Sequence, residues 1–75
     1  MIEYRNRIHA DPSILNGKPV IKGTRISVEL VLSRLAEGAS VQALLEAWPN
    51  LSLADIQAAF AYSAAVIAHE ELLVG

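Results

Sequence analysis

The chain has no cysteine among its 75 residues, which excludes disulfides and thiolate metal sites. Its two histidines, His9 and His69, lie far apart and outside any metal-ligand spacing such as His-Glu-x-x-His. A domain of this size buries only about 60% of the surface of its unfolded chain, and without cross-links it usually needs a partner chain for stability. The hydrophobic fraction of 53% is slightly above that of an ordinary soluble domain. We therefore expect a single domain, residues 1–75, that forms a homodimer or higher oligomer.

Long apolar runs are also lacking. The first seven residues have no apolar core of signal-peptide length, and no run approaches the length of a membrane span. We therefore expect a cytoplasmic protein without a membrane partner. His9 and Asp11 are close enough in sequence to form a catalytic pair, but no nucleophile or second base is placed to join them. The sequence predicts that the protein is not an enzyme and holds no metal or cofactor.

Cations are absent after residue 34. The first 34 residues contain all six cations and three acids, whereas the remainder contains five acids. The two parts thus carry charges of +3 and −5 and differ in sign. We expect contacts with an anionic partner, whether protein or nucleic acid, to use the cations of the first part: Arg5, Arg7, Lys18, Lys22, Arg25 and Arg34.

The N-terminal part has the pattern of short strands. Residues 2–9 alternate between apolar and polar side chains, which predicts a half-buried strand with a basic outer face. Asn16-Gly17 predicts a turn. Residues 19–21 and 25–26 flank Lys22-Gly23-Thr24 and predict a short hairpin, with Pro19 favouring an edge position.

Three helices are expected after the strands. Their starts are marked by serines that suit the N-cap position, Ser27, Ser40 and Ser52. Gly38 is placed to end the first helix and Pro49 the second. Asp55 stands at the capping-box position of the third, which extends to about residue 72. The predicted class is mainly α, with strands and a basic hairpin in residues 1–26 and a three-helix helix-turn-helix in residues 27–72.

The third helix has no lysine or arginine, so we do not expect it to enter the major groove of DNA. Its apolar arc is wider than one small core covers, which predicts an oligomer interface at Ala58, Ala61, Ala65, Ala68 and Leu72. The alternative is an alanine-rich helix of high helical propensity. Tyr62 and His69 share its polar stripe, and either contact a partner or are ordinary surface residues. Trp48, at the end of the second helix, is expected to close the core.

The basic hairpin, with Lys18, Lys22 and Arg25, is the main candidate site. Gly17-Lys18-Pro19 is not a phosphate-binding loop, because no serine or threonine follows the lysine and proline has no N–H. An anion-facing patch, joined by Arg5 and Arg7, would bind a nucleic-acid backbone or an acidic protein. The other interpretation is a solvated edge strand whose cations prevent aggregation. The sequence leaves both open.

Most of the chain resembles the bacterial family known as domain of unknown function 433, DUF433. The resemblance rests on Gly17-Lys18-Pro19-Val20-Ile21-Lys22-Gly23-Thr24-Arg25-Ile26, preceded by Ile8 and Asp11-Pro12 and followed by Trp48-Pro49, Leu51-Ser52 and Asp55-Ile56. Asn16 departs from the glycine common there. The resemblance implies a homeodomain-like fold with short N-terminal strands. It also implies an antitoxin of a type II toxin–antitoxin pair, whose partner is a PIN-like ribonuclease with an acidic metal-binding site.

Two functions follow as hypotheses. In the first, the basic hairpin docks on the acidic cleft of the toxin and blocks metal or RNA. In the second, the protein is a dimeric helix-turn-helix transcriptional regulator that contacts operator DNA through its N-terminal cations. An oligomeric scaffold without either partner is a third, weaker hypothesis.

Overall fold

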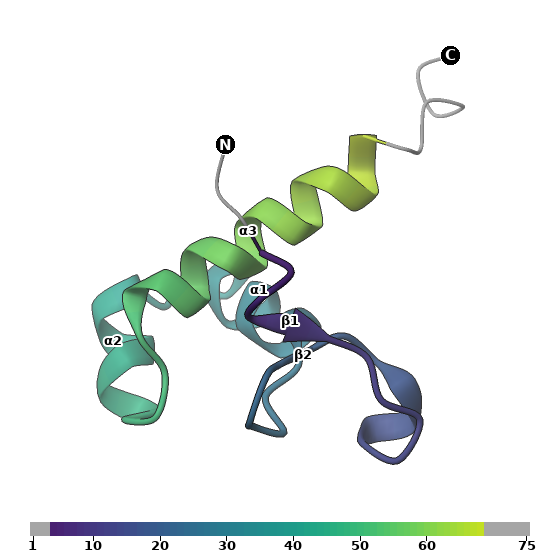
Figure 1. Cartoon of the computed structure of the whole chain (residues 1–75). Helices are drawn as coiled ribbons and strands as arrows, with labels where there is room; N and C mark the ends of the chain where they lie inside the picture. Colours follow the sequence, from purple (N-terminus) through teal and green to yellow (C-terminus); the bar gives the residue numbers. More distant parts are fainter. Residues whose placement is uncertain (1–3, 69–75) are drawn as a thin grey trace.

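The computed structural model describes residues 4–68 and is mainly helical, with the predicted order of short strands followed by three helices (Figure 1). The elements are β1 (Ile8–His9), a short 3₁₀ helix η1 (Leu15–Gly17), β2 (Val20–Ile21), α1 (Val28–Ala36), α2 (Val41–Ala47) and α3 (Leu53–Ala68). No helix in this described part is long and apolar enough to cross a membrane.

The two strands form a minimal antiparallel sheet. Ile8 pairs with Ile21 and His9 with Val20. The prediction of a strand over residues 2–9 is therefore wrong in its extent, because Arg7 N and Ile8 N both donate to the Tyr4 carbonyl in a turn (3.0 and 2.9 Å). The alternation continues through that turn, but only the two residues of β2 supply paired partners for β1. Residues 1–3 lie outside the described part.

All three helices begin where the serines predict. Ser27 Oγ accepts from Leu30 N (2.9 Å) and Ser40 Oγ accepts from Ala43 N (3.0 Å). At α3 the capping box is complete, since Asp55 N donates to Ser52 Oγ (3.2 Å) and Ser52 N donates to the Asp55 carboxylate (3.0 Å). Two backbone donors at this helix end are thereby satisfied.

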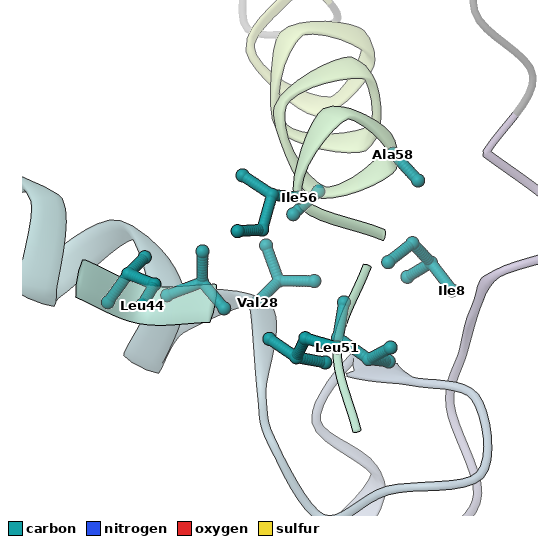
Figure 2. Close-up of a cluster of buried hydrophobic side chains, with 9 residues drawn as sticks. Ile8, Val28, Leu44, Leu51, Ile56 and Ala58 are labelled. Carbon is teal, nitrogen blue, oxygen red and sulfur yellow. The ribbon is translucent and has the colours of Figure 1, made fainter. Parts of the chain in front are cut away.

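The core lies where α3 crosses the other elements. Figure 2 shows side chains from the strands, from all three helices and from the loop before α3 meeting around Ile56, which is fully buried. Leu51 and Ile56 flank the start of α3 and belong to the same buried cluster, as a hydrophobic staple requires. Trp48 is half-buried and packs against this cluster, so the prediction that it closes the core is confirmed.

The structure changes the predicted alanine interface on α3. Ala58 is 0% exposed and belongs to the core of the chain itself, so it is not available to a partner helix. Ala61 and Ala65 are half-buried, whereas Ala68 is exposed. Leu72, predicted to continue this face, and His69 lie outside the described residues. The physical reason is that strand β1 and helix α1 reach further around α3 than the helical periodicity indicates.

Candidate functional site

The candidate site is the turn that joins β2 to α1, and we call residues 22–25 the basic loop. Thr24 N donates to the Ile21 carbonyl (3.0 Å), which closes a β-turn over Lys22 and Gly23. Gly23 has φ +82°, the backbone conformation that the third position of a type II turn requires. Gly23 therefore allows the chain to reverse its direction between Lys22 and Thr24.

The Thr24 side chain stabilises the basic loop by hydrogen bonds to the backbone on both sides of it. Its hydroxyl donates to the Ile21 carbonyl (2.7 Å) and accepts from Ile26 N (2.9 Å). Below the loop, Ile21 N donates to the Ile26 carbonyl (2.9 Å). The Gly-Thr-Arg sequence therefore encodes a small closed turn, anchored on β2 at one end and on the capped start of α1 at the other.

Lys22 and Arg25 project from this turn into solvent. Both side chains are exposed, and within residues 4–68 neither forms an ion pair. The Lys22 backbone N–H, in contrast, donates to the Arg7 carbonyl (2.7 Å) and extends the ladder between the strands. The loop consequently presents two cations on a fixed backbone.

Lys18 differs from Lys22 and Arg25 because it forms an ion pair with an acidic residue of α1. Its Nζ lies 2.7 Å from Glu29 Oε1 on α1. The hydrogen bond from Lys18, together with its charge, lowers the pKa of the Glu29 carboxyl below its ordinary value. Both side chains are exposed, and a surface pair of this kind adds little to stability. Lys18 lies between η1 and β2, outside the basic loop, and its charge is balanced by Glu29.

Arg7 has a structural role that the sequence did not indicate. Its Nη1 lies 2.9 Å from Asp55 Oδ1, which links the segment before β1 to the first turn of α3. Partial burial raises the pKa of the Asp55 carboxyl, but the hydrogen bonds from Ser52 and Arg7 outweigh this effect and leave the pKa below its ordinary value. The Arg7 guanidinium is therefore paired with a residue of α3.

The two remaining cations lie elsewhere. Arg34 is in the last turn of α1, 3.8 Å from Glu37, and is not brought together with the basic loop. Arg5 stacks over the Tyr4 ring, with its guanidinium carbon 5.4 Å from the ring centre. Tyr4 in turn makes an edge contact with Tyr62 at 5.5 Å, so Tyr62 contributes to packing within the chain. The predicted patch of six cations thus reduces to the exposed pair on the basic loop.

The Asp11 carboxylate is hydrogen-bonded to Ser13, and within the described residues no hydrogen bond joins it to His9. The Asp11 carboxylate accepts from the backbone N–H and the hydroxyl of Ser13 (2.8 and 2.7 Å). These bonds, the backbone bond first, lower the pKa of the Asp11 carboxyl. His9 Nε2 is buried without a hydrogen-bond partner in the described chain. Within that same part, no three His, Asp or Glu side chains converge as metal ligands would.

An apolar groove lies between α1 and the C-terminal half of α3, and sequence reasoning did not foresee it. Its volume is about 430 Å³, and its walls include Leu32 of α1 with Tyr62 and Val66 of α3. The Lys18–Glu29 ion pair also lines it. Its only sequence signal is the excess of apolar residues towards the end of α3, which predicts an uncovered surface but not its shape.

Comparison with known proteins decides the family. The family described as "Protein of unknown function (DUF433)" matches residues 8–63, which include both strands, the basic loop and most of α3. The chain belongs to the DUF433 family.

Two relatives show how much of the chain is shared with other proteins. The "Uncharacterized protein y4eO" of Sinorhizobium fredii (strain NBRC 101917 / NGR234) is 43% identical over 61 residues, or 81% of this chain and 28% of that protein. The crystal structure of a DUF433 member from Anabaena variabilis ATCC 29413 has a TM-score of 0.75 at 33% identity and covers 77% of this chain and 57% of that one. The chain therefore spans less than two thirds of either relative.

Proposed function

We propose that this DUF433 protein is a non-catalytic binding protein, the antitoxin of a type II pair, which neutralises a PIN-like ribonuclease. The observation that carries the proposal is the basic loop, where Lys22 and Arg25 stand exposed on a hydrogen-bonded turn and have no ion pair within residues 4–68. The resemblance of the sequence to its family supplies the class of partner.

The chemistry of the two partners is complementary. An acidic metal-binding cleft holds several carboxylates close together, and two cations entering it would pair with them in place of the metal. Close charge pairs across interfaces couple by about 1.5–7 kcal/mol in measured cases. Because Gly23 and Thr24 already fix the turn, little loop entropy is lost when the basic loop docks. Lys22 and Arg25 are thus the residues on which inhibition is expected to depend.

The alternative of a DNA-binding regulator is less well supported by the geometry. A recognition helix presents polar and basic side chains to the bases. On α3 the exposed side chains of residues 53–68 are uncharged, and its single charged residue, Asp55, is paired with Arg7. Any contact with operator DNA would therefore depend on the N-terminal cations.

Co-purification of the full chain with the protein encoded beside its gene tests the proposal. We expect a PIN-like ribonuclease whose RNA cleavage the chain suppresses. The Lys22→Ala/Arg25→Ala variant should restore cleavage, whereas Arg34→Glu, which changes the net charge equally on another surface, should inhibit like the native chain. Full inhibition by the double variant would contradict the mechanism, and a partner without nuclease activity would contradict the proposed function.

A further inference from the structure

The Asn16-Gly17 pair of η1 is a chemically labile site that the proposed function does not use. Asn16 is exposed, and Figure 1 shows η1 in the loop between β1 and β2, which extends away from the three helices. Asparagine is one of the thermally labile residues, and a following glycine leaves the backbone nitrogen free to attack the side-chain amide. The other asparagines of the chain, Asn6 and Asn50, precede bulky side chains, an arginine and a leucine, which hinder this attack.

In the folded turn the two reacting groups face away from each other. Asn16 has φ 58° and ψ 31°. In an L-residue this ψ places the nitrogen of the next residue nearly opposite Cβ across the Cα–C bond, far from the side-chain amide. The Gly17 N–H also donates to the Ile14 carbonyl (3.0 Å), so its proton is already engaged. Reaction between the two groups therefore requires η1 to open first.

Few interactions keep η1 closed. Leu15 has φ +49°, a left-handed conformation that is strained for a residue with a Cβ. Its side chain is 39% exposed, so burial offsets only part of this strain. The turn itself is closed by the bond from Gly17 N to the Ile14 carbonyl and by a longer one from Lys18 N to the Leu15 carbonyl (3.2 Å). Segments held this weakly open locally while the rest of the chain stays folded.

We propose that Asn16 deamidates spontaneously in the folded protein, at a rate set by local opening of η1. In the open turn the Gly17 nitrogen attacks Cγ of Asn16. A new N–Cγ bond replaces the Cγ–Nδ2 bond, and the side-chain nitrogen leaves as ammonia with the proton from Gly17. Water then opens the resulting succinimide ring at one of its two carbonyls. Hydrolysis at Cγ yields aspartate, and hydrolysis at the main-chain carbonyl yields isoaspartate.

The two products differ in their effect on the turn. Aspartate keeps the main chain intact and, like asparagine, adopts the left-handed conformation. Isoaspartate routes the main chain through the side chain and lengthens it by one carbon, inside the turn that the bond from Lys18 N to the Leu15 carbonyl closes. We expect isoaspartate to keep η1 open. Both products add one negative charge to the net −2 of the chain. Neither alters Lys22 or Arg25, so the inference stands independently of the proposed function.

Mass spectrometry of the full chain during incubation in mildly alkaline buffer gives the first test. Trypsin does not cleave before Pro19, so Asn16 appears in the peptide 8–22, in which it is the single asparagine. This peptide should gain the one mass unit that separates –OH from –NH2, whereas the peptides with Asn6 and Asn50 keep their mass. In guanidinium chloride, which unfolds the turn, conversion should be about tenfold faster. No conversion in the folded chain over many half-lives of the unfolded reaction, or equal rates in both solvents, overturns the proposal.

Substitution of Leu15 tests whether the turn controls the rate. Leu15→Gly removes the strain at positive φ and should slow conversion in the folded chain about threefold, even though glycine gains entropy in the open turn. Leu15→Ala is the matched control, because it removes the side chain but keeps the strain and should not slow conversion. Each rate is divided by that of the same variant in guanidinium chloride, which removes any direct effect on the reaction. A native ratio for Leu15→Gly, or equal slowing by Leu15→Ala, would overturn control by η1.

Discussion

Asp55 concentrates several interactions in one side chain. Its carboxylate accepts from Ser52 N at the start of α3 and from the Arg7 guanidinium, which lies 48 residues earlier in the sequence. It therefore caps a helix and ties the N-terminal segment to it. Because its pKa is below the ordinary value in the folded chain, folding favours the charged carboxylate. The stability gained this way is present above the ordinary pKa and is lost as the pH falls through the lowered one.

We predict that Asp55→Ala lowers the free energy of unfolding by about 1 kcal/mol near neutral pH, the usual cost of losing a helix cap. As the pH falls below about 4 the native chain progressively loses this contribution, so the two curves should approach each other with increasing acidity. Urea unfolding at a series of pH values measures the difference. Arg7→Ala is the matched control, since it removes the ion pair but keeps the cap and should be milder. A constant difference across the acidic range would mean that the charge of Asp55 adds nothing.

At the scale of the element, the shape of the basic loop depends on Gly23. A Cβ at this position would meet no atom within 4 Å, so only the positive φ of +82° resists substitution. Gly23→Ala should therefore destabilise the chain by about 1–2 kcal/mol through backbone strain alone. Gly23→Asn should be milder, because asparagine adopts this conformation more readily. Thermal unfolding of both variants measures the order; equal stability of Gly23→Ala and the native chain would show that the turn rearranges freely.

The elements also show what the sequence can and cannot predict. The helix starts at Ser27, Ser40 and Ser52 were predictable because a cap involves neighbours only three residues apart. The extent of β1 was not, since pairing depends on a partner strand whose length the alternation does not reveal. The same holds for the site: the sequence indicated its cations, but which of them are paired depends on contacts such as Arg7 with Asp55 that only the fold creates.

At the scale of the whole molecule, charge and apolar surface lie on different sides. The exposed pair of cations is on the loop between β2 and α1 (Figure 1), whereas the exposed large apolar side chains Leu53, Phe60 and Ile67 are on α3. The net charge of −2 predicts no general affinity for nucleic acid. Any binding to DNA would therefore be local to the basic loops. A dimer with two such loops would neutralise only about four phosphates.

The salt dependence of DNA binding follows from this count. Each neutralised phosphate contributes about −0.9 to the slope of log K against log salt, so a dimer bound by its basic loops should show a slope no steeper than about −3.6. Lys22→Ala/Arg25→Ala should remove the binding, and Gln57→Ala on the exposed face of α3 should leave the slope unchanged. Fluorescence anisotropy on duplex DNA at several salt concentrations measures both. If Gln57→Ala abolished binding while the loop variant bound normally, α3 would be a recognition helix, and its exposed face would contact the bases.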